Sequence, residues 1–388
     1  MRRQCRYVGI ATIVNAVAGY GYTFSTMKLT AKVKLLPTEQ QRTLLYATLT
    51  TVNCGCDWAS AIAFEYGVFK QFDLHHLAYT TLKEDFHLSA QLAVRTIAKV
   101  AYAYKVGKKD TAYTFHPHGA IAYDDRILTW NTRYKEVSIW CMGGRQKIDF
   151  VCDDRTYQRL QSRSGESDLA FVDGNFYLFA ACDIDIPAPI DVSDFLGVDL
   201  GIVNIATDSD GNQYSGKQVN ALRYRHRRLR QKLQAKGTRS ARRKLRQRRR
   251  KESRFAKDVN HCISKQLCPE GALRAKDTHR GIALEELGGI RDRQTVRKAQ
   301  RSTFTGWSFN DLRQKVTYKT LLAGIPITFV DPRNTSRTCP SCGCIDKRNR
   351  KTQSQFKCVE CGYCANADIN AARNISCRAV VNLPNAPL

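Results

Sequence analysis

Acidic residues are scarce in this sequence. The 388 residues include 62 Lys and Arg against 35 Asp and Glu, which gives a formal net charge of +27. An excess of this size destabilises a compact chain by self-repulsion unless a polyanion neutralises it. We therefore expect nucleic acid as the main partner, with an acidic membrane surface as the weaker alternative.

Long apolar runs are also lacking. The stretch from Tyr7 to Phe24 is interrupted by Asn15 and is too short and too rich in glycine for a membrane span. Its basic start resembles that of a weak signal peptide, but Met27 opens a better-patterned segment that looks like a natural beginning. We interpret residues 1–26 as an extension outside the functional chain, and we expect activity to survive its removal.

Cysteine is frequent, but it is not concentrated as in a small secreted protein. The 15 cysteines are scattered over a long chain, which argues against a disulfide scaffold and for a reducing compartment. The hydrophobic content of 43% indicates a globular chain, and its length allows two or three domains. We expect a cytoplasmic protein with no membrane attachment.

Two C-x-x-C pairs lie near the C-terminus, each followed directly by glycine (Gly343 and Gly362). The paired residues are Cys339, Cys342, Cys358 and Cys361. A tight turn that presents two thiolates to one metal needs a flexible residue after the pair, and this spacing fits a tetrahedral four-thiolate zinc site. Disulfides and unrelated core cysteines are the alternatives. The nearby Cys344 and Cys364 leave the ligand set open, but we expect the two pairs that precede glycine.

The first half of the chain reads as a β structure interrupted by helices. From Met27, apolar residues alternate with Lys32, Lys34 and other polar residues, which predicts a half-buried strand with a basic outer face. Residues 38–106 show helical spacing, and residues 113–195 return to short alternating runs separated by turns. Together these patterns predict a small β-barrel with a helical bundle inserted in it.

A second domain is predicted to open at Phe195. Asp199 lies between Val198 and Leu200, which places an acid in the middle of an apolar strand. A carboxylate buried there without a partner would cost several kcal/mol, a cost that a bound cation removes. We expect the flanking Gly197 and Gly201 to keep the approach open for a bulky substrate.

The segment from Arg223 to Lys251 holds 16 Lys and Arg among 29 residues and no acid. We interpret it as two helices that break near Gly237 and lie along phosphates; a disordered basic arm is the alternative. The candidate nucleic-acid contacts are Arg227, Arg228, Arg230, Lys232, Arg242, Arg243 and Arg246, together with Lys32 and Lys34 of the first strand.

Two further acids follow downstream. Glu285 ends another short apolar strand, and Asp368 opens a last helix directly after the cysteine pairs. A basic loop from Arg291 to Arg301 lies between them and could cover a substrate. The order strand-hairpin, helix, strand, helix, strand, helix is that of an RNase H-like fold, in which Asp199, Glu285 and Asp368 converge at the carboxyl edge of the sheet. Three carboxylates there can hold two Mg²⁺ or Mn²⁺ ions for phosphodiester hydrolysis, while the thiolates take zinc.

At this point the chain resembles a known family. The segments VDLGI around Asp199, ALEEL around Glu285 and ADINAARNI around Asp368 look like the three RuvC segments of TnpB, and the cysteine pairs look like its zinc insert. TnpB is the RNA-guided nuclease of insertion-sequence transposons and a relative of the type V CRISPR effectors. The resemblance runs from Met27 to Ile375, so the segment before Met27 departs from the family.

The resemblance implies an α+β multidomain protein and the nuclease role of the three acids. The implied parts are a split wedge β-barrel (residues 27–37 and 113–194), an inserted helical recognition domain (38–112), a RuvC domain (195–337 and 365–380), a zinc ribbon (338–364) and a tail (381–388). It further implies a guide RNA from the transposon end that pairs with one strand of double-stranded target DNA beside a short flanking motif. The resemblance also implies a prokaryotic protein associated with the nucleoid. One or two protein copies per RNA are both compatible with this.

Several other functions share some of these features. A miniature type V CRISPR effector shares all of the motifs and differs in its neighbouring DNA. A nuclease-inactive RNA-guided repressor would lack one of the acids, and a transposase of the three-acid type would lack the cysteine insert. A structural zinc-ribbon protein would leave the acids in the strands unexplained.

Overall fold

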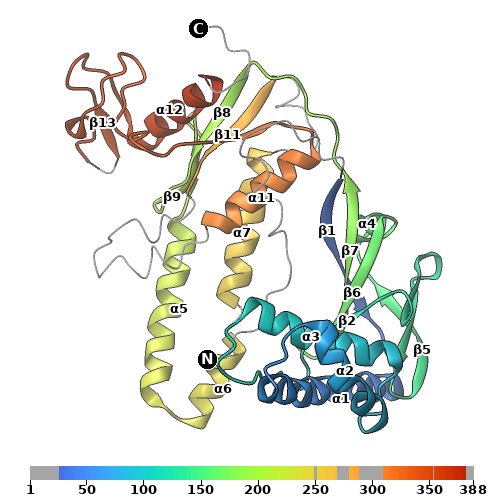
Figure 1. The fold of residues 1–388 in the computed structure, drawn as a ribbon. Coiled ribbons are helices and arrows are strands. Elements are labelled where there is room, and N and C mark those ends of the chain that lie inside the picture. The colour runs from blue at the N-terminus through green and yellow to red at the C-terminus, as the bar shows by residue number, and fades with distance from the viewer. Residues whose placement is uncertain (1–25, 249–250, 269–278, 288–308, 353, 382–388) are drawn as a thin grey trace. The chain divides into compact units, whose positions relative to one another are not determined.

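The computed structural model describes residues 26–248, 251–268, 279–287, 309–352 and 354–381. The described chain divides into two compact units, Thr26–Ile184 and Asp185–Leu388, which are considered separately below (Figure 1). Within the described ranges, none of the helices has the length and apolar character needed to cross a membrane. The predicted basic loop from Arg291 to Arg301 lies outside the described residues.

The first unit is built on a seven-stranded, nearly closed antiparallel barrel with the order β2-β6-β7-β1-β5-β4-β3. Its strands are β1 (Thr26–Leu35), β2 (Ile121–Tyr123), β3 (Leu128–Asn131), β4 (Glu136–Cys141), β5 (Gly144–Val151), β6 (Arg163–Val172) and β7 (Asn175–Asp185). Buried and exposed residues alternate along β1, as predicted, because successive side chains of a strand point to opposite faces. The strand at the start of the chain therefore completes a sheet whose other members follow the helices.

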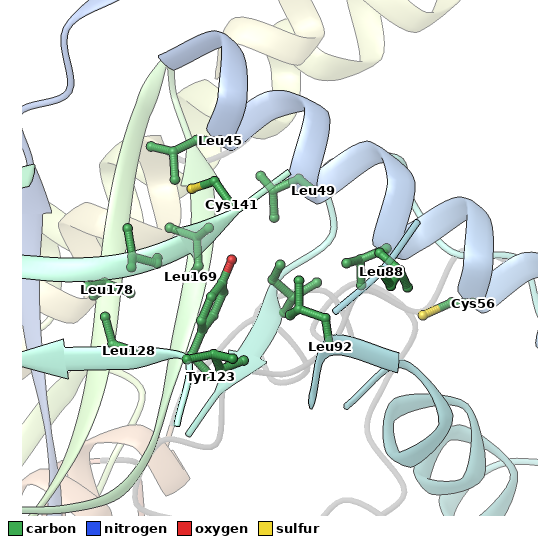
Figure 2. Close-up of a cluster of buried hydrophobic side chains, with 14 of the residues drawn as sticks. Leu45, Leu49, Cys56, Leu88, Leu92, Tyr123, Leu128, Cys141, Leu169 and Leu178 are labelled. Atoms are coloured by element: carbon green, nitrogen blue, oxygen red, sulfur yellow. The ribbon is translucent and has the colours of Figure 1, made fainter. Parts of the chain in front are cut away.

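Three helices separate β1 from β2, where the sequence predicted a helical bundle. They are α1 (Glu39–Glu65), α2 (Gln71–Glu84) and α3 (Ala90–Val106). Thr38 caps α1 in a reciprocal arrangement with Gln41: the Thr38 hydroxyl accepts the N–H of Gln41 and the Gln41 side-chain oxygen accepts the N–H of Thr38, so two backbone donors at the start of the helix are satisfied. Leu45 and Leu49 of α1 point at Cys141 and Leu169 of the barrel (Figure 2), so helices and barrel share one core.

Sequence patterns missed two short elements of this unit. Helix α4 (Asp154–Leu160) follows β5 and begins at Asp153, whose carboxylate accepts the N–H of Thr156. The three-residue strand β2 is too short for its alternation to stand out. A 3-10 turn, η2 (Thr132–Tyr134), joins β3 to β4.

The second unit contains a five-stranded sheet with the order β10-β9-β8-β11-β12. Its strands are β8 (Asp194–Asp199), β9 (Asn204–Asp208), β10 (Gln213–Ser215), β11 (Arg280–Glu285) and β12 (Ile327–Val330). Strand β11 pairs in parallel with both β8 and β12, while β8, β9 and β10 form an antiparallel meander. Because Leu284 pairs with Val198, the next residues along, Glu285 and Asp199, end neighbouring strands at the same edge.

Helices flank this sheet. They are α5 (Lys217–Lys236), α6 (Arg239–Arg248), α7 (Lys251–Leu267), α11 (Phe309–Leu322) and α12 (Ala367–Val381). The break between α5 and α6 falls at Gly237, which has a left-handed backbone with φ of 61°, so the predicted pair of helices is confirmed. Helix α12 lies against β8 (Figure 1).

Two expectations about Asp199 and its neighbours are wrong. The chain leaves β8 directly after Asp199, so this acid ends the strand instead of lying in its middle. Gly197 does not open a path for substrate, because a Cβ there would lie 2.0 Å from the carbonyl oxygen of Ala372 in α12. Gly197 and the buried Ala372 instead allow the last helix to approach the sheet. A Cβ on Gly201 would meet the Asn204 carbonyl oxygen at 2.8 Å, so this glycine serves the turn into β9.

Candidate metal centres

The four predicted cysteines gather at one point. The Sγ atoms of Cys339, Cys342, Cys358 and Cys361 all lie within 4.8 Å of one another. Cys339 is 3.6 Å from Cys361 and Cys342 is 3.5 Å from Cys358, far beyond the ~2.05 Å of a disulfide. Four sulfurs at ~2.3 Å from a zinc ion would be about 3.8 Å apart. The cluster therefore fits a structural zinc, and the disulfide alternative is excluded for these pairs.

Local backbone geometry explains why the two pairs converge. Gly343 and Gly362 both have left-handed backbones, with φ of 74° and 72°, which a glycine adopts without strain. A short hairpin of β13 (Gln355–Lys357) and β14 (Cys364–Asn366) carries the second pair, and a 3-10 turn, η3 (Lys347–Asn349), follows the first. Cys344 and Cys364 lie close by but outside the four-sulfur group.

Asn349 is a contributor that the sequence analysis missed. It is fully buried, and its Nδ2 donates to the carbonyl oxygens of Arg337 and Cys344 at 3.0 and 3.2 Å. Its Oδ1 accepts the N–H of Val359 at 2.9 Å. One amide thus ties the first cysteine turn to the second, which holds the cluster together in addition to any metal.

The thiols differ in acidity. Backbone N–H groups, chiefly that of Cys361, lower the pKa of Cys358 to about 6. The backbone N–H of Cys344 favours the thiolate of Cys342, but desolvation and the hydrogen bonds with the three neighbouring thiols outweigh it and raise the pKa of Cys342 to about 12. A zinc ion would ionise all four, since a coordinating thiol is deprotonated outright.

The three predicted carboxylates lie at one edge of the sheet. Asp199 ends β8, Glu285 ends the adjacent β11, and Asp368 lies in the first turn of α12. Burial, together with the charges of Glu285 and Asp368, raises the pKa of Asp199 from 3.8 to about 8. The other two acids are therefore near enough for their charges to disfavour ionisation of Asp199. Among the described residues, however, only the four cysteines gather as tightly as ligands around one ion.

Glu285 is held by a hydroxyl group. Its exposed fraction is 8%, and its Oε1 accepts a hydrogen bond from Thr335 Oγ1 at 2.5 Å. Burial raises the pKa of Glu285, and the Thr335 hydroxyl opposes that rise. The adjacent Glu286 faces another way, in a two-pronged ion pair with Arg313 at 2.6 Å for each contact. The neighbouring acids of this strand end thus have different partners.

Asp368 has two partners that the sequence analysis did not identify. Asn204, the first residue of β9, donates to its Oδ2 at 3.0 Å. Arg350, from the segment between the cysteine pairs, places Nη2 3.8 Å from its Oδ1 and also lowers the pKa values of Asp199 and Glu285. No local motif marks these two residues, because only the fold brings them to the acids.

The predicted nucleic-acid contacts on α5 and α6 are all exposed: Arg227, Arg228, Arg230, Lys232, Arg242, Arg243 and Arg246. Only Val219 of α5 and Ala241 of α6 are buried. On the barrel, Lys32 is exposed and lies over the ring of Tyr177 at 4.0 Å, while Lys34 is half-buried. The two helices therefore carry a dense positive surface, and their role as contacts stays a prediction.

Comparison with known proteins relates these features to two family models. A family model described as "Probable transposase" (OrfB_IS605) matches residues 183–272, and the model "Cas12f1-like, TNB domain" matches residues 309–375. Over these two segments the chain is similar to the OrfB/TnpB family and to Cas12f1-like proteins. The first match contains Asp199, and the second contains the four cysteines and Asp368. Glu285 lies between the two matches.

Individual relatives agree with this assignment. The CRISPR-associated endodeoxyribonuclease Cas12f1 of Sulfoacidibacillus thermotolerans is 34% identical over 203 residues, which is 48% of this chain and 46% of the relative. A protein of Escherichia coli (strain K12), described provisionally as the RNA-guided DNA endonuclease InsQ, is 29% identical over 221 residues, 52% of this chain and 53% of the relative. A TnpB-like protein of Methanocaldococcus jannaschii is 32% identical over 126 residues, 32% of this chain and 43% of the relative.

The chain thus spans about half the length of the first two relatives. The match to a solved structure is longer. The protein of a cryo-EM structure of a Cas12f1-sgRNA-target DNA complex superposes with a TM-score of 0.57 at 14% identity, over 91% of this chain and 99% of that one. The chain therefore has a Cas12f-like α+β fold.

Proposed function

We propose that the chain is the RNA-guided DNA endonuclease of a transposable element. In this proposal a guide RNA pairs with one strand of double-stranded DNA beside a short flanking motif, and the chain then hydrolyses phosphodiester bonds of the target. The observation that supports it most directly is the grouping of Asp199, Glu285 and Asp368 at one sheet edge, where burial and the charges of the other two acids raise the pKa of Asp199.

The donor set fits a divalent cation of the magnesium type. Three carboxylates offer only hard oxygen ligands, which suit Mg²⁺ or Mn²⁺ better than zinc, and their repulsion is what a cation would relieve. When bound, two such ions would activate the attacking water and stabilise the leaving 3′ oxygen. Asp199, Glu285 and Asp368 would hold them, and the four cysteines would hold one structural zinc.

The residues around the acids would serve to orient them. Asn204 and Arg350 contact the Asp368 carboxylate, and Thr335 fixes one oxygen of Glu285. Arg350 also places a positive charge beside the acids, where a DNA phosphate would have to lie. Each of these groups favours the ionised carboxylate, which is the form that binds a cation.

The remaining parts follow the family plan in this proposal. The barrel (27–37 and 113–194) would be the wedge domain and residues 38–112 the recognition domain. Residues 195–337 and 365–380 would form the RuvC domain, with the zinc ribbon at 338–364. The basic surface of α5 and α6 would contact RNA or DNA phosphates. The identity to Cas12f1 favours one second candidate, a miniature type V CRISPR effector.

One preparation tests the proposal. The purified protein should carry RNA, and sequencing this RNA should reveal a transposon end; repeats of a CRISPR array would favour the second candidate. With that RNA, the protein should cleave matching DNA in Mg²⁺. Asp199→Ala and Glu285→Gln should keep the RNA and lose cleavage, while the neighbouring Glu286→Gln should retain both. Cleavage by the Asp199 variant at the parental rate would refute the assignment of the acids.

A further inference from the structure

The connector, residues 331–338, leads from β12 into the first zinc-binding cysteine. It has few regular backbone hydrogen bonds of its own; Asn334, in a left-handed conformation with φ of 60°, accepts the N–H groups of Arg337 and Thr338 at 2.9 Å each. A segment of this kind needs partners elsewhere to have a fixed shape. Those partners lie on α12, the helix that carries Asp368.

Three side chains at four-residue spacing bind the connector to α12. Asn370 donates to the Thr338 carbonyl oxygen at 3.1 Å, and Asn374 donates to the carbonyl oxygens of Thr335 and Thr338 at 2.8 Å each. Arg378 donates to the carbonyl oxygens of Asp331 and Arg333 at 2.7 Å each. Residues four apart lie on one face of a helix, so one stripe of α12 fixes the whole connector.

The connector in turn reaches the acid at the end of β11. Thr335 is 3% exposed, and its hydroxyl lies 2.5 Å from Glu285 Oε1 and 3.1 Å from the Pro332 carbonyl oxygen. A single hydroxyl proton cannot serve both acceptors, and an ionised carboxylate is the stronger of the two. The hydroxyl is therefore aimed at Glu285 whenever that carboxylate is charged.

We propose that Thr335 is a positioning residue that fixes Glu285 relative to Asp368 through the connector. Glu285 is linked through the Thr335 hydroxyl to a backbone that Asn370, Asn374 and Arg378 attach to the helix of Asp368. The same backbone continues into Cys339, whose N–H donates to Cys344 at 2.9 Å within the cysteine cluster. The proposal rests on the nuclease function for its catalytic consequence but not for the contact itself.

The first experiment is a thermal-unfolding cycle without added divalent cations. Thr335→Val removes the hydroxyl at nearly constant shape and should lower the melting temperature by about 4 °C. In a Glu285→Met background, where the acceptor is gone, the same change should have less than a quarter of this effect. Thr335→Ser, which keeps the hydroxyl, should behave as the parent. An equal loss in both backgrounds would overturn the proposal, and this result would not depend on any cleavage activity.

The second experiment is a Mg²⁺ titration of cleavage by the RNA-bound protein. Partners that orient metal ligands typically contribute tenfold or more to metal affinity, so Thr335→Val should raise the half-saturating Mg²⁺ concentration by about tenfold. The matched control is Thr338→Val, since the Thr338 hydroxyl donates to Asn334 in the same connector and not to an acid. An equal shift in both variants would assign Thr335 a structural role only. If the parent protein cleaved no DNA, the proposed function would fail while the unfolding cycle would still decide the contact.

Discussion

Replacing Asp199 by asparagine should stabilise the metal-free protein while it abolishes cleavage. Burial and the charges of Glu285 and Asp368 raise the pKa of Asp199 from 3.8 to about 8. Each pKa unit corresponds to about 1.4 kcal/mol, so the upper limit of the penalty is about 6 kcal/mol. Solvent reaching this partly exposed side chain lowers the penalty below this limit, so the asparagine variant should gain at most about 6 kcal/mol at pH 8.

The stability difference between the Asp199→Asn variant and the parent should depend on pH in a defined direction. Between about pH 4 and pH 8 the folded protein keeps the Asp199 proton that the unfolded chain releases, so the parent loses stability as the pH rises through this window. Asparagine does not titrate. The stability advantage of Asp199→Asn should therefore be near zero at pH 4, grow up to pH 8 and then level off.

Urea unfolding at several pH values between 5 and 8, without chelators so that zinc is retained, measures this difference. Asp346→Asn is a control in which the substitution should destabilise the protein, because hydrogen bonds from Arg348 lower the pKa of the half-buried Asp346 to about 2. The Asp346→Asn substitution should lower the free energy of unfolding by the same amount at every pH between 5 and 8. Adding Mg²⁺ should stabilise the parent more than the Asp199 variant. The electrostatic account would be refuted if the stability difference between Asp199→Asn and the parent did not change from pH 5 to 8, or if Asp199→Asn were less stable than the parent at pH 8.

Three further outcomes are expected. Cys358→Ser should lose the bound zinc, measured by elemental analysis, and lower the melting temperature, whereas Cys364→Ser should change neither; zinc loss in both would enlarge the ligand set. Gly197→Ala should destabilise the second unit by about 3 kcal/mol or more in urea unfolding, because the new Cβ meets the Ala372 carbonyl oxygen at 2.0 Å; a neutral effect would show that α12 can move away. Arg227→Gln should weaken RNA binding and flatten its dependence on salt by about 0.7 to 0.9 in the log–log slope, and an unchanged slope would remove this residue from the phosphate contacts.

Much of the architecture followed from local patterns. The alternation along β1, the helical spacing over α1 to α3 and the glycine that separates α5 from α6 each reflect a rule that acts over a few residues. The four-cysteine cluster could also be predicted from the sequence, since the spacing of the pairs and the glycines after them define two turns without any tertiary contact. Short elements such as β2 and α4 escaped because a run of three to seven residues shows too little periodicity.

The acids were identifiable from the sequence, but their surroundings were not. Asp199 was recognised as an acid beside apolar residues, yet its place at the strand end and the packing role of Gly197 depend on where α12 lies. Asn204 and Arg350 are ordinary polar residues in the sequence, and they become significant only because β9 and the cysteine insert fold next to Asp368.

The sequence by itself determined the residue types that the proposed function would use: four thiolates for a soft metal, three carboxylates for a hard one and a surplus of positive charge for a polyanion. These follow from covalent chemistry and need no fold. The tertiary structure decided the distances between these groups. It also decided the hydrogen bond from Thr335 to Glu285 and the hydrogen bonds from α12 to the connector. Such contacts join residues tens to hundreds of positions apart, and their geometry arises only when the sheet and the last helix pack together.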